Sequence, residues 1–179
     1  PFIGLLRNFY AWTWGDALLV TIDPYWGSST CPDNNYWTGE KRTNMWDVTH
    51  GDLQYQWLKQ TLEQSTAKYK FVFAHHVLGT GRGGTDEAGE YEWGGYNGNG
   101  TWGFTANRPN WALPIHQLMA TNHVTMFVQC HDHIFVREQL DGVTYLTLPI
   151  PADDGYHLYN AAYYPNAIYK TNNSGYVRF

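Results

Sequence analysis

The sequence predicts an α/β fold: a mixed sheet with flanking helices and long loops rich in glycine and tryptophan. Short apolar runs of strand length alternate with two segments of helical periodicity, and this order predicts a sheet with helices packed on at least one face. The chain has 179 residues, the size of one domain. Its composition is 43% hydrophobic and 17% aromatic, which is enough apolar surface for a core.

The first regular element is a predicted hairpin. Residues 8–14 are aromatic and extended, and Gly15 and Asp16 can form the turn. Residues 17–23 form a nearly continuous apolar run, which favours a strand buried on both faces. Residues 24–50 are rich in Pro, Gly, Ser, Asn and Trp, and we expect a long loop there.

A helix is predicted after this loop. Thr49 and Asp52 resemble a capping box at its start. The residues that recur at helical spacing on its expected apolar face are Leu53, Trp57, Leu58 and Leu62. Polar residues interleave with them: Gln54, Lys59, Gln60 and Glu63. An amphipathic helix that packs on the sheet is therefore expected.

The middle of the chain supplies two further strands. Residues 69–74 form a short apolar strand that runs into two histidines, and residues 123–129 form another. Between them, residues 77–107 hold ten of the 18 glycines, and we expect mostly coil. Trp111–Thr121 is a predicted helix, with Pro114 in its first turn.

A closing hairpin is predicted near the C-terminal end. Residues 134–139 and 143–148 are the strands, and Asp141 and Gly142 the turn. The tail from Pro149 is polar and aromatic, and we expect it to be irregular.

Composition excludes several classes of function. The net charge of −5 and the scattered basic residues argue against a nucleic-acid-binding patch. No apolar run approaches the roughly 20 residues that span a bilayer. Two cysteines, Cys31 and Cys130, are too few for a disulfide framework; they either pair with each other or stay free thiols.

Histidines follow the predicted strands where a site in an α/β sheet is expected. His75 ends one strand, and His131 and His133 end the next. In an extended segment the last two would share one face, with Cys130 and Asp132 on the other. Neutral imidazoles held at strand ends suit a metal ion. The alternative is a polar rim with ordinary hydrogen bonds.

Five segments, taken together, resemble a known family. Residues 69–76 (YKFVFAHH) are similar to the strand-plus-histidine motif of calcineurin-like metallophosphoesterases, and residues 129–134 (QCHDHI) to their Gly-His-x-His motif. Residues 141–148 are similar to the hairpin that follows in that family. Residues 9–23 resemble its Tyr-Ser-Phe-x-x-Gly strand pair, and residues 54–62 the helix after it. The purple-acid-phosphatase-like branch is the most similar.

The resemblance implies hydrolysis of phosphate esters at a dinuclear metal site with Zn, Mn or Fe. It implies that His75 and His131 bind one metal ion and that His133 binds the other. Two such cations hold the attacking and leaving oxygens of an in-line displacement. His76 matches no family ligand: it either contacts phosphate or orients His75 as part of the catalytic machinery, or it is a solvated loop histidine. Cys130 stands where the family has glycine. Because cysteine has a Cβ, we expect ordinary backbone angles at this position.

The family's earlier motifs are Asp-x-His, Gly-Asp-x-x-Asp and Gly-Asn-His-Asp/Glu, and the chain contains none of them. We therefore expect residues 1–179 to be one incomplete domain, the C-terminal half of a metallophosphoesterase-type α/β sandwich. Its partners would be the N-terminal half of the same domain and a phosphate ester, and its location secreted or periplasmic. Alone, the chain should show little turnover. The alternative is a non-catalytic structural or binding module that uses its aromatic loops or self-assembly.

Two features of the glycine-rich loop have open interpretations. Arg82, within Gly79–Gly84, could bind substrate phosphate; a flexible loop is the alternative. The loop's acidic residues could bind a cation, although a solvated acidic loop is the favoured interpretation: Asp86, Glu87, Glu90 and Glu92.

Overall fold

The computed structural model describes residues 8–29, 44–77, 82–150 and 157–172, and its centre is a seven-stranded mixed sheet in the order β1-β2-β3-β4-β6-β5-β7. The strands are β1 (Tyr10–Trp14), β2 (Ala17–Thr21), β3 (Tyr69–Phe73), β4 (Met126–Gln129), β5 (Phe135–Leu140), β6 (Val143–Thr147) and β7 (Tyr169–Thr171). The helices are α1 (Gly51–Gln64), α2 (Tyr91–Gly94), α3 (Phe104–Asn107) and α4 (Ile115–Thr121), with 3₁₀ turns η1 (Glu87–Gly89) and η2 (Ala161–Tyr163). The predicted α/β class with a mixed sheet is confirmed.

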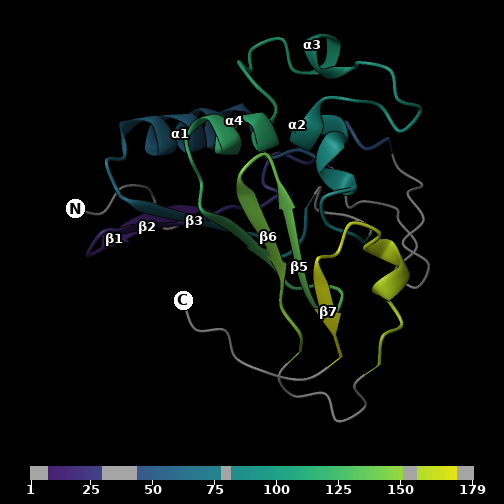
Figure 1. Cartoon of the computed structure of the whole chain (residues 1–179). Coiled ribbons are helices and arrows are strands. Elements are labelled where there is room, and N and C mark those ends of the chain that lie inside the picture. The colour runs from purple at the N-terminus through teal and green to yellow at the C-terminus, as the bar shows by residue number, and fades with distance from the viewer. Residues whose placement is uncertain (1–7, 30–43, 78–81, 151–156, 173–179) are drawn as a thin grey trace.

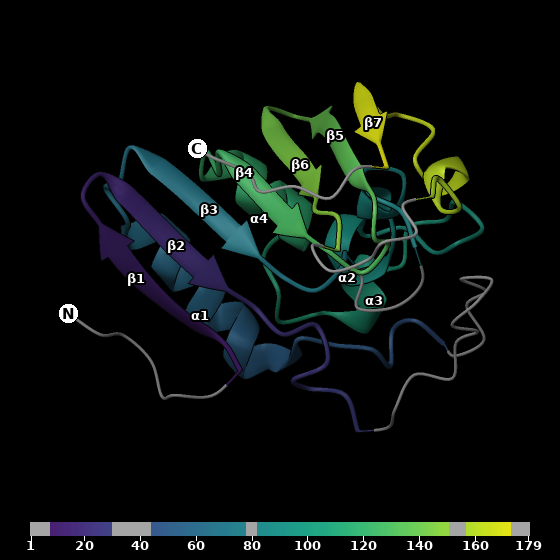
Figure 2. The same ribbon diagram turned by 90° about the horizontal axis from the view of Figure 1, so that it is seen from below.

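The helices α1 to α4 lie on one face of the sheet, as Figure 1 shows and as the view from below in Figure 2 confirms. Strands β2, β3, β4 and β6 are parallel neighbours, and β1, β5 and β7 pair in the antiparallel sense. The two parallel connections from β2 to β3 and from β3 to β4 carry the helices, as right-handed crossovers do in α/β sheets.

The hairpin of β1 and β2 forms as predicted, with Gly15 at a φ of +56° in its turn. The expectation that β2 is buried on both faces was wrong. Leu18 and Val20 are buried in the core, whereas Ala17 and Leu19 are only half-buried. Successive side chains point to opposite faces, and the face of Ala17 and Leu19 has no helix over it.

The N-terminus of α1 differs from the predicted capping box. The N-cap is His50, without a side-chain capping bond. The Thr49 hydroxyl accepts a hydrogen bond from the Gly51 amide (2.9 Å), and the Asp52 carboxylate accepts one from the Trp111 indole (2.7 Å). Both side chains that would form the box are therefore bound to other partners.

The buried face of α1 is rotated relative to the prediction. Leu58 and Leu62 are buried as expected, but Leu53 is 62% exposed and Gln54 is fully buried. Gln54 accepts from the Asp23 amide (2.7 Å) and donates to the carbonyls of Asp23 (2.7 Å) and His50 (3.1 Å). A buried amide is tolerated because its hydrogen bonds are satisfied inside the protein.

The long loops contain little regular structure, as expected. In the described parts of residues 24–50 and 77–107, no helix exceeds the four residues of α2 and α3. The helix predicted from Trp111 begins later, because Pro114 is extended (ψ 155°) and serves as the N-cap of α4. Trp111 stacks on Tyr55 instead, with ring centroids 4.0 Å apart.

The closing hairpin of β5 and β6 is confirmed, and positive φ angles at Asp141 (46°) and Gly142 (83°) form its turn. The expectation of an irregular tail holds only in part: coil and turns predominate in residues 157–172, but β7 pairs with β5 and Tyr164 is fully buried. Tyr164 packs in a small second core with Ile134 and Val136. This apolar contact holds the tail on the sheet.

The face of the sheet opposite the helices is rich in aromatic side chains. Register places Trp14, Ala17 and Tyr69 in one row across β1, β2 and β3. The exposed large side chains on this face include Tyr10, Trp12, Trp14 and Tyr69, and register adds Tyr169 of β7. Among the described helices, none covers this face. In the same residues, no helix is long and apolar enough to cross a bilayer.

Candidate metal-binding site

The sheet brings the ends of β3 and β4 together. The ladder continues beyond the strands, since the Ala74 amide donates to the Val128 carbonyl (3.1 Å) and the Cys130 amide to the His75 carbonyl (3.0 Å). His75 and Cys130 are therefore neighbours, and His131 comes next along the chain. Carboxyl ends of adjacent parallel strands are the usual position of sites in α/β proteins.

Three histidine rings lie together at this edge. His75 Nε2 and His131 Nδ1 are 3.2 Å apart, and the rings of His76 and His131 have centroids 4.4 Å apart. His133 is exposed; burial lowers the pKa of His75, and the charge of His133 lowers it further. The predicted residues His75, His76 and His131 are thus brought into contact, and His133 lies near enough for its charge to act on His75 and His131.

The loop after β4 is not an extended segment, contrary to the expectation. His131 and His133 have φ angles of 32° and 55°, in the left-handed region, and Cys130 has no positive φ. Cys130 therefore stands at ordinary backbone angles, as its side chain requires, and is an exposed free thiol. Its alternative partner, Cys31, lies outside the described residues.

Asp132 points inward between the two histidines and is 3% exposed. Its carboxylate accepts from Arg82 Nη1 (2.6 Å), the Gly83 amide (3.1 Å) and the Tyr164 hydroxyl (2.7 Å). The Arg82 side chain is 8% exposed, so its guanidinium is directed at Asp132. As placed, Arg82 supports the histidine loop.

His76 is buried, and its Nε2 lies 3.1 Å from the Tyr25 hydroxyl. Its Nδ1 has no hydrogen-bond partner within the described ranges. Burial lowers the pKa of His76 well below its usual value, and the charges of His131, His75 and Arg82 lower it further. His76 is therefore a neutral side chain in this setting, not a solvated loop histidine.

The pair His75 and His131 fits two ligand positions of one metal ion. Burial lowers the pKa of both rings, the charge of His133 lowers that of His75, and the charge of His75 lowers that of His131, so both imidazoles are uncharged at neutral pH and each has a ring nitrogen with a lone pair. Two ligands of a tetrahedral zinc ion at ~2.0–2.1 Å lie about 3.3 Å apart, close to the observed 3.2 Å. Within the described ranges, however, no group of three or more His, Cys, Asp and Glu side chains is arranged to hold a metal ion. Further ligands are needed.

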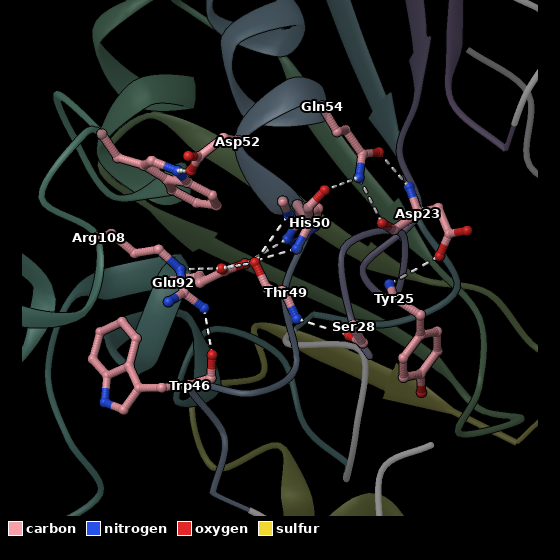
Figure 3. Close-up of polar contacts among 12 residues, drawn as sticks. Asp23, Tyr25, Ser28, Trp46, Thr49, His50, Asp52, Gln54, Glu92 and Arg108 are labelled. Carbon is pink, nitrogen blue, oxygen red and sulfur yellow. Dashed lines mark hydrogen bonds and ion pairs between the residues drawn. The ribbon is translucent and has the colours of Figure 1, made fainter. Parts of the chain in front are cut away.

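A second polar cluster lies between the loops, and sequence reasoning missed it (Figure 3). Glu92 is 3% exposed, against the expectation of a solvated acidic loop. Its carboxylate accepts from the Thr49 hydroxyl, the His50 amide (3.0 Å), His50 Nδ1 (2.9 Å) and Arg108 Nε. Arg108 also donates to the Trp46 carbonyl. The sequence around Glu92 contains no local pattern that predicts a partner such as Thr49, 43 residues upstream.

The ionisation of Glu92 follows from these contacts. Burial raises the pKa of Glu92, but the hydrogen bond and charge of His50 and the charge of Arg108 lower it more, so the net shift is downward. The carboxylate is charged at neutral pH and joins three segments: residues 46–50, α2 and residue 108. This cluster is structural.

The chain is thus an α/β protein with a histidine cluster at the carboxyl ends of two parallel strands. No protein-family model matches its sequence, and none of the curated proteins does. Among solved structures, PhoD aligns with a TM-score of 0.58 and 11% identity, covering 94% of this chain and 35% of PhoD. The fold of this chain is therefore similar to that of part of PhoD.

Two further solved structures align at lower TM-scores. One is purple acid phosphatase PPD1 from yellow lupin seeds (TM-score 0.46, 13% identity, 93% of this chain and 27% of that one). The other is GAP50, the anchor in the inner membrane complex of Plasmodium (TM-score 0.43, 11% identity, 93% and 43%). The chain spans less than half the length of each of the three proteins.

Proposed function

We propose that this chain supplies histidine ligands to the dinuclear metal site of a phosphate-ester hydrolase. The observation that carries the proposal is the pair of neutral imidazoles, His75 and His131, with ring nitrogens 3.2 Å apart at the carboxyl edge of the sheet. Their spacing suits two ligands of one cation. The metallophosphoesterase-like fold supports the same conclusion.

Each histidine has a proposed role. His75 and His131 bind one metal ion and His133 binds the second, where Zn, Mn or Fe would polarise the phosphate and activate water when bound. His76, neutral and held by the Tyr25 hydroxyl, orients His75 or contacts the phosphate. Contact between Arg82 and substrate stays a prediction, since its Nη1 is bound to Asp132.

The remaining ligands are proposed to come from the rest of the same domain. The face of the sheet opposite the helices presents Trp12, Trp14 and Tyr69 to solvent, and an exposed apolar patch of this kind is typical of a surface that another layer covers. We propose that the N-terminal half packs there and brings the aspartate and asparagine ligands. A secreted or periplasmic location is proposed from the family resemblance alone.

The non-catalytic alternative is favoured by one observation: the described residues form no three-ligand metal group. An assay separates the two functions. The intact polypeptide that contains this chain is assayed with an activated aryl phosphate and Zn²⁺, Mn²⁺ or Fe, beside the 179-residue chain alone. The enzyme proposal predicts robust turnover only for the intact polypeptide.

A matched pair of variants tests the histidine site itself. His131→Gly should lower turnover by about 100-fold or more, because it removes a metal ligand. His123→Gly is the control, since His123 is an exposed histidine that also has a positive φ (56°). Glycine accepts such angles, so neither change strains the backbone. Equal activity of the two variants, or an inactive intact protein with every metal, would favour the structural alternative.

A further inference from the structure

We infer that Asp132 is a positioning residue: it is clamped by Arg82 and by Tyr164 of the C-terminal tail, and it holds the strained backbone from which His131 and His133 project. The inference rests on the proposed metal site, because it concerns how that site's histidines are held. It assigns a role to the tail, residues 157–172, which no sequence motif indicated.

The backbone around Asp132 needs external support. The residues on either side, His131 and His133, have φ angles of 32° and 55°, a region that side chains other than glycine seldom adopt. Such angles persist only where the surrounding structure over-determines them, and they concentrate at functional sites. The support here comes from the buried side chain between the two histidines.

The Asp132 carboxylate is held from two sides. Arg82 Nη1 (2.6 Å) and the Gly83 amide (3.1 Å) reach it from the glycine-rich loop, and the Tyr164 hydroxyl (2.7 Å) reaches it from the tail. The tail also holds the main chain, because Asn160 Nδ2 donates to the Asp132 carbonyl (2.8 Å). Side chain and backbone of one residue are thus fixed by separate groups.

Tyr164 is arranged to donate its only hydroxyl proton to Asp132. The hydroxyl accepts from Thr147 Oγ1 (3.3 Å) and Gln129 Nε2 (3.4 Å), which directs its own proton to the carboxylate. Tyr164 is fully buried, and burial raises its pKa, so it keeps this proton. Gln129 also accepts from the Val77 amide (2.9 Å), which joins the cluster to the loop after His76.

The clamp is tested with Tyr164→Phe in the intact polypeptide, with Tyr159→Phe as the matched control. Tyr159 belongs to the same tail but is 79% exposed. The probe is Zn²⁺ alone, with affinity measured by competition with a chelator. Tyr164→Phe should weaken Zn²⁺ binding about 10–100-fold, the usual effect of removing a partner that orients a ligand. Tyr159→Phe should bind as the wild type does.

A double variant separates positioning from general damage. In a His131→Gly background, Tyr164→Phe should cause a smaller further loss of Zn²⁺ affinity, because the part of its effect that passes through His131 is already gone. Undiminished loss in that background, or wild-type affinity of Tyr164→Phe, would overturn the inference. If Tyr164→Phe does not fold, Asn160→Ala removes only the carbonyl contact and is expected to weaken binding in the same direction.

A metal-free measurement keeps the inference separate from the proposed function. If the wild type binds no Zn²⁺, the metal site fails, and the clamp is judged from the imidazole NMR signals of His75 and His131. The wild type and Tyr159→Phe should show the contact between these two rings, and Tyr164→Phe should lose it. Unchanged ring signals in Tyr164→Phe would refute the clamp.

Discussion

Replacing Glu92 by glutamine tests whether the buried cluster of Figure 3 holds the glycine-rich loop in place. Glutamine keeps the shape of the side chain but removes its negative charge. Its NH₂ group replaces one carboxylate oxygen and cannot accept a hydrogen bond from the donors around it. Glu92 accepts four hydrogen bonds, two from His50 and one each from Thr49 and Arg108. The Arg108 side chain is 13% exposed, so its charge would stay buried without a counterion.

The expected loss can be worked out from these contacts. Removing one partner of a buried ion pair costs about 3–5 kcal/mol, since the other charge is left uncompensated. For a protein of this size, each kcal/mol lowers Tm by about 2–4 °C, so Glu92→Gln should lower it by roughly 6–20 °C. The control is Glu63→Gln on α1: Glu63 is 45% exposed and pairs with Lys59, and its loss should cost at most about 1 kcal/mol.

The assay is urea unfolding followed by circular dichroism, repeated as a function of pH. The folded-state pKa of Glu92 lies below its ordinary value of 4.5, so its stabilisation is present above about pH 4.5 and is lost as the pH falls further. The difference between wild type and Glu92→Gln should therefore be large at pH 7 and shrink below pH 4.5. A difference at pH 7 no larger than that of Glu63→Gln, or one that persists unchanged at pH 3, would refute the reasoning.

Two further predictions concern packing and are checked by the same unfolding measurement. Leu62→Ala should lower the free energy of unfolding by about 2–5 kcal/mol because Leu62 is fully buried, whereas Leu53→Ala should change it by at most about 0.5 kcal/mol because Leu53 is 62% exposed. Equal effects of the two substitutions would mean that the buried face of α1 is assigned incorrectly. Gly94→Ala should cost about 1–3 kcal/mol or more, since a Cβ there would lie 2.2 Å from the backbone of Gly89, whereas Gly89→Ala meets open space and should be nearly neutral. Equal stability of these two glycine variants would contradict the close approach of Gly94 to the Gly89 backbone.

The sequence was sufficient to predict strands β1 to β6 and the place of the histidines at the strand ends, because both depend on local patterns. The apolar runs before His75 and before Cys130 mark two strands, and adjacent parallel strands end at the same edge. The same logic fails where a partner is distant in the chain. Gln54 looks like a solvent-facing residue of a helix, yet its amide bonds Asp23, 31 residues upstream.

The candidate site was predicted in part for the same reason. Alternation in His-Asp-His separates Asp132 from the two histidines, and Asp132 does point inward. The positive φ angles that achieve this were not predicted, because they depend on the tail residue Tyr164. Nothing in the polar and aromatic sequence after Pro149 indicates that one of its tyrosines is fully buried.

The contact between Asp132 and Tyr164 also has a consequence for biosynthesis. The two residues are 32 positions apart, and the tyrosine is the later one. At a ribosomal rate of about 5–20 residues per second, the histidine loop is made roughly 2–6 s before its clamp. During that interval both histidines are already present in the nascent chain without the hydroxyl that fixes them. The histidine loop can therefore reach its final conformation only after translation has passed the tail.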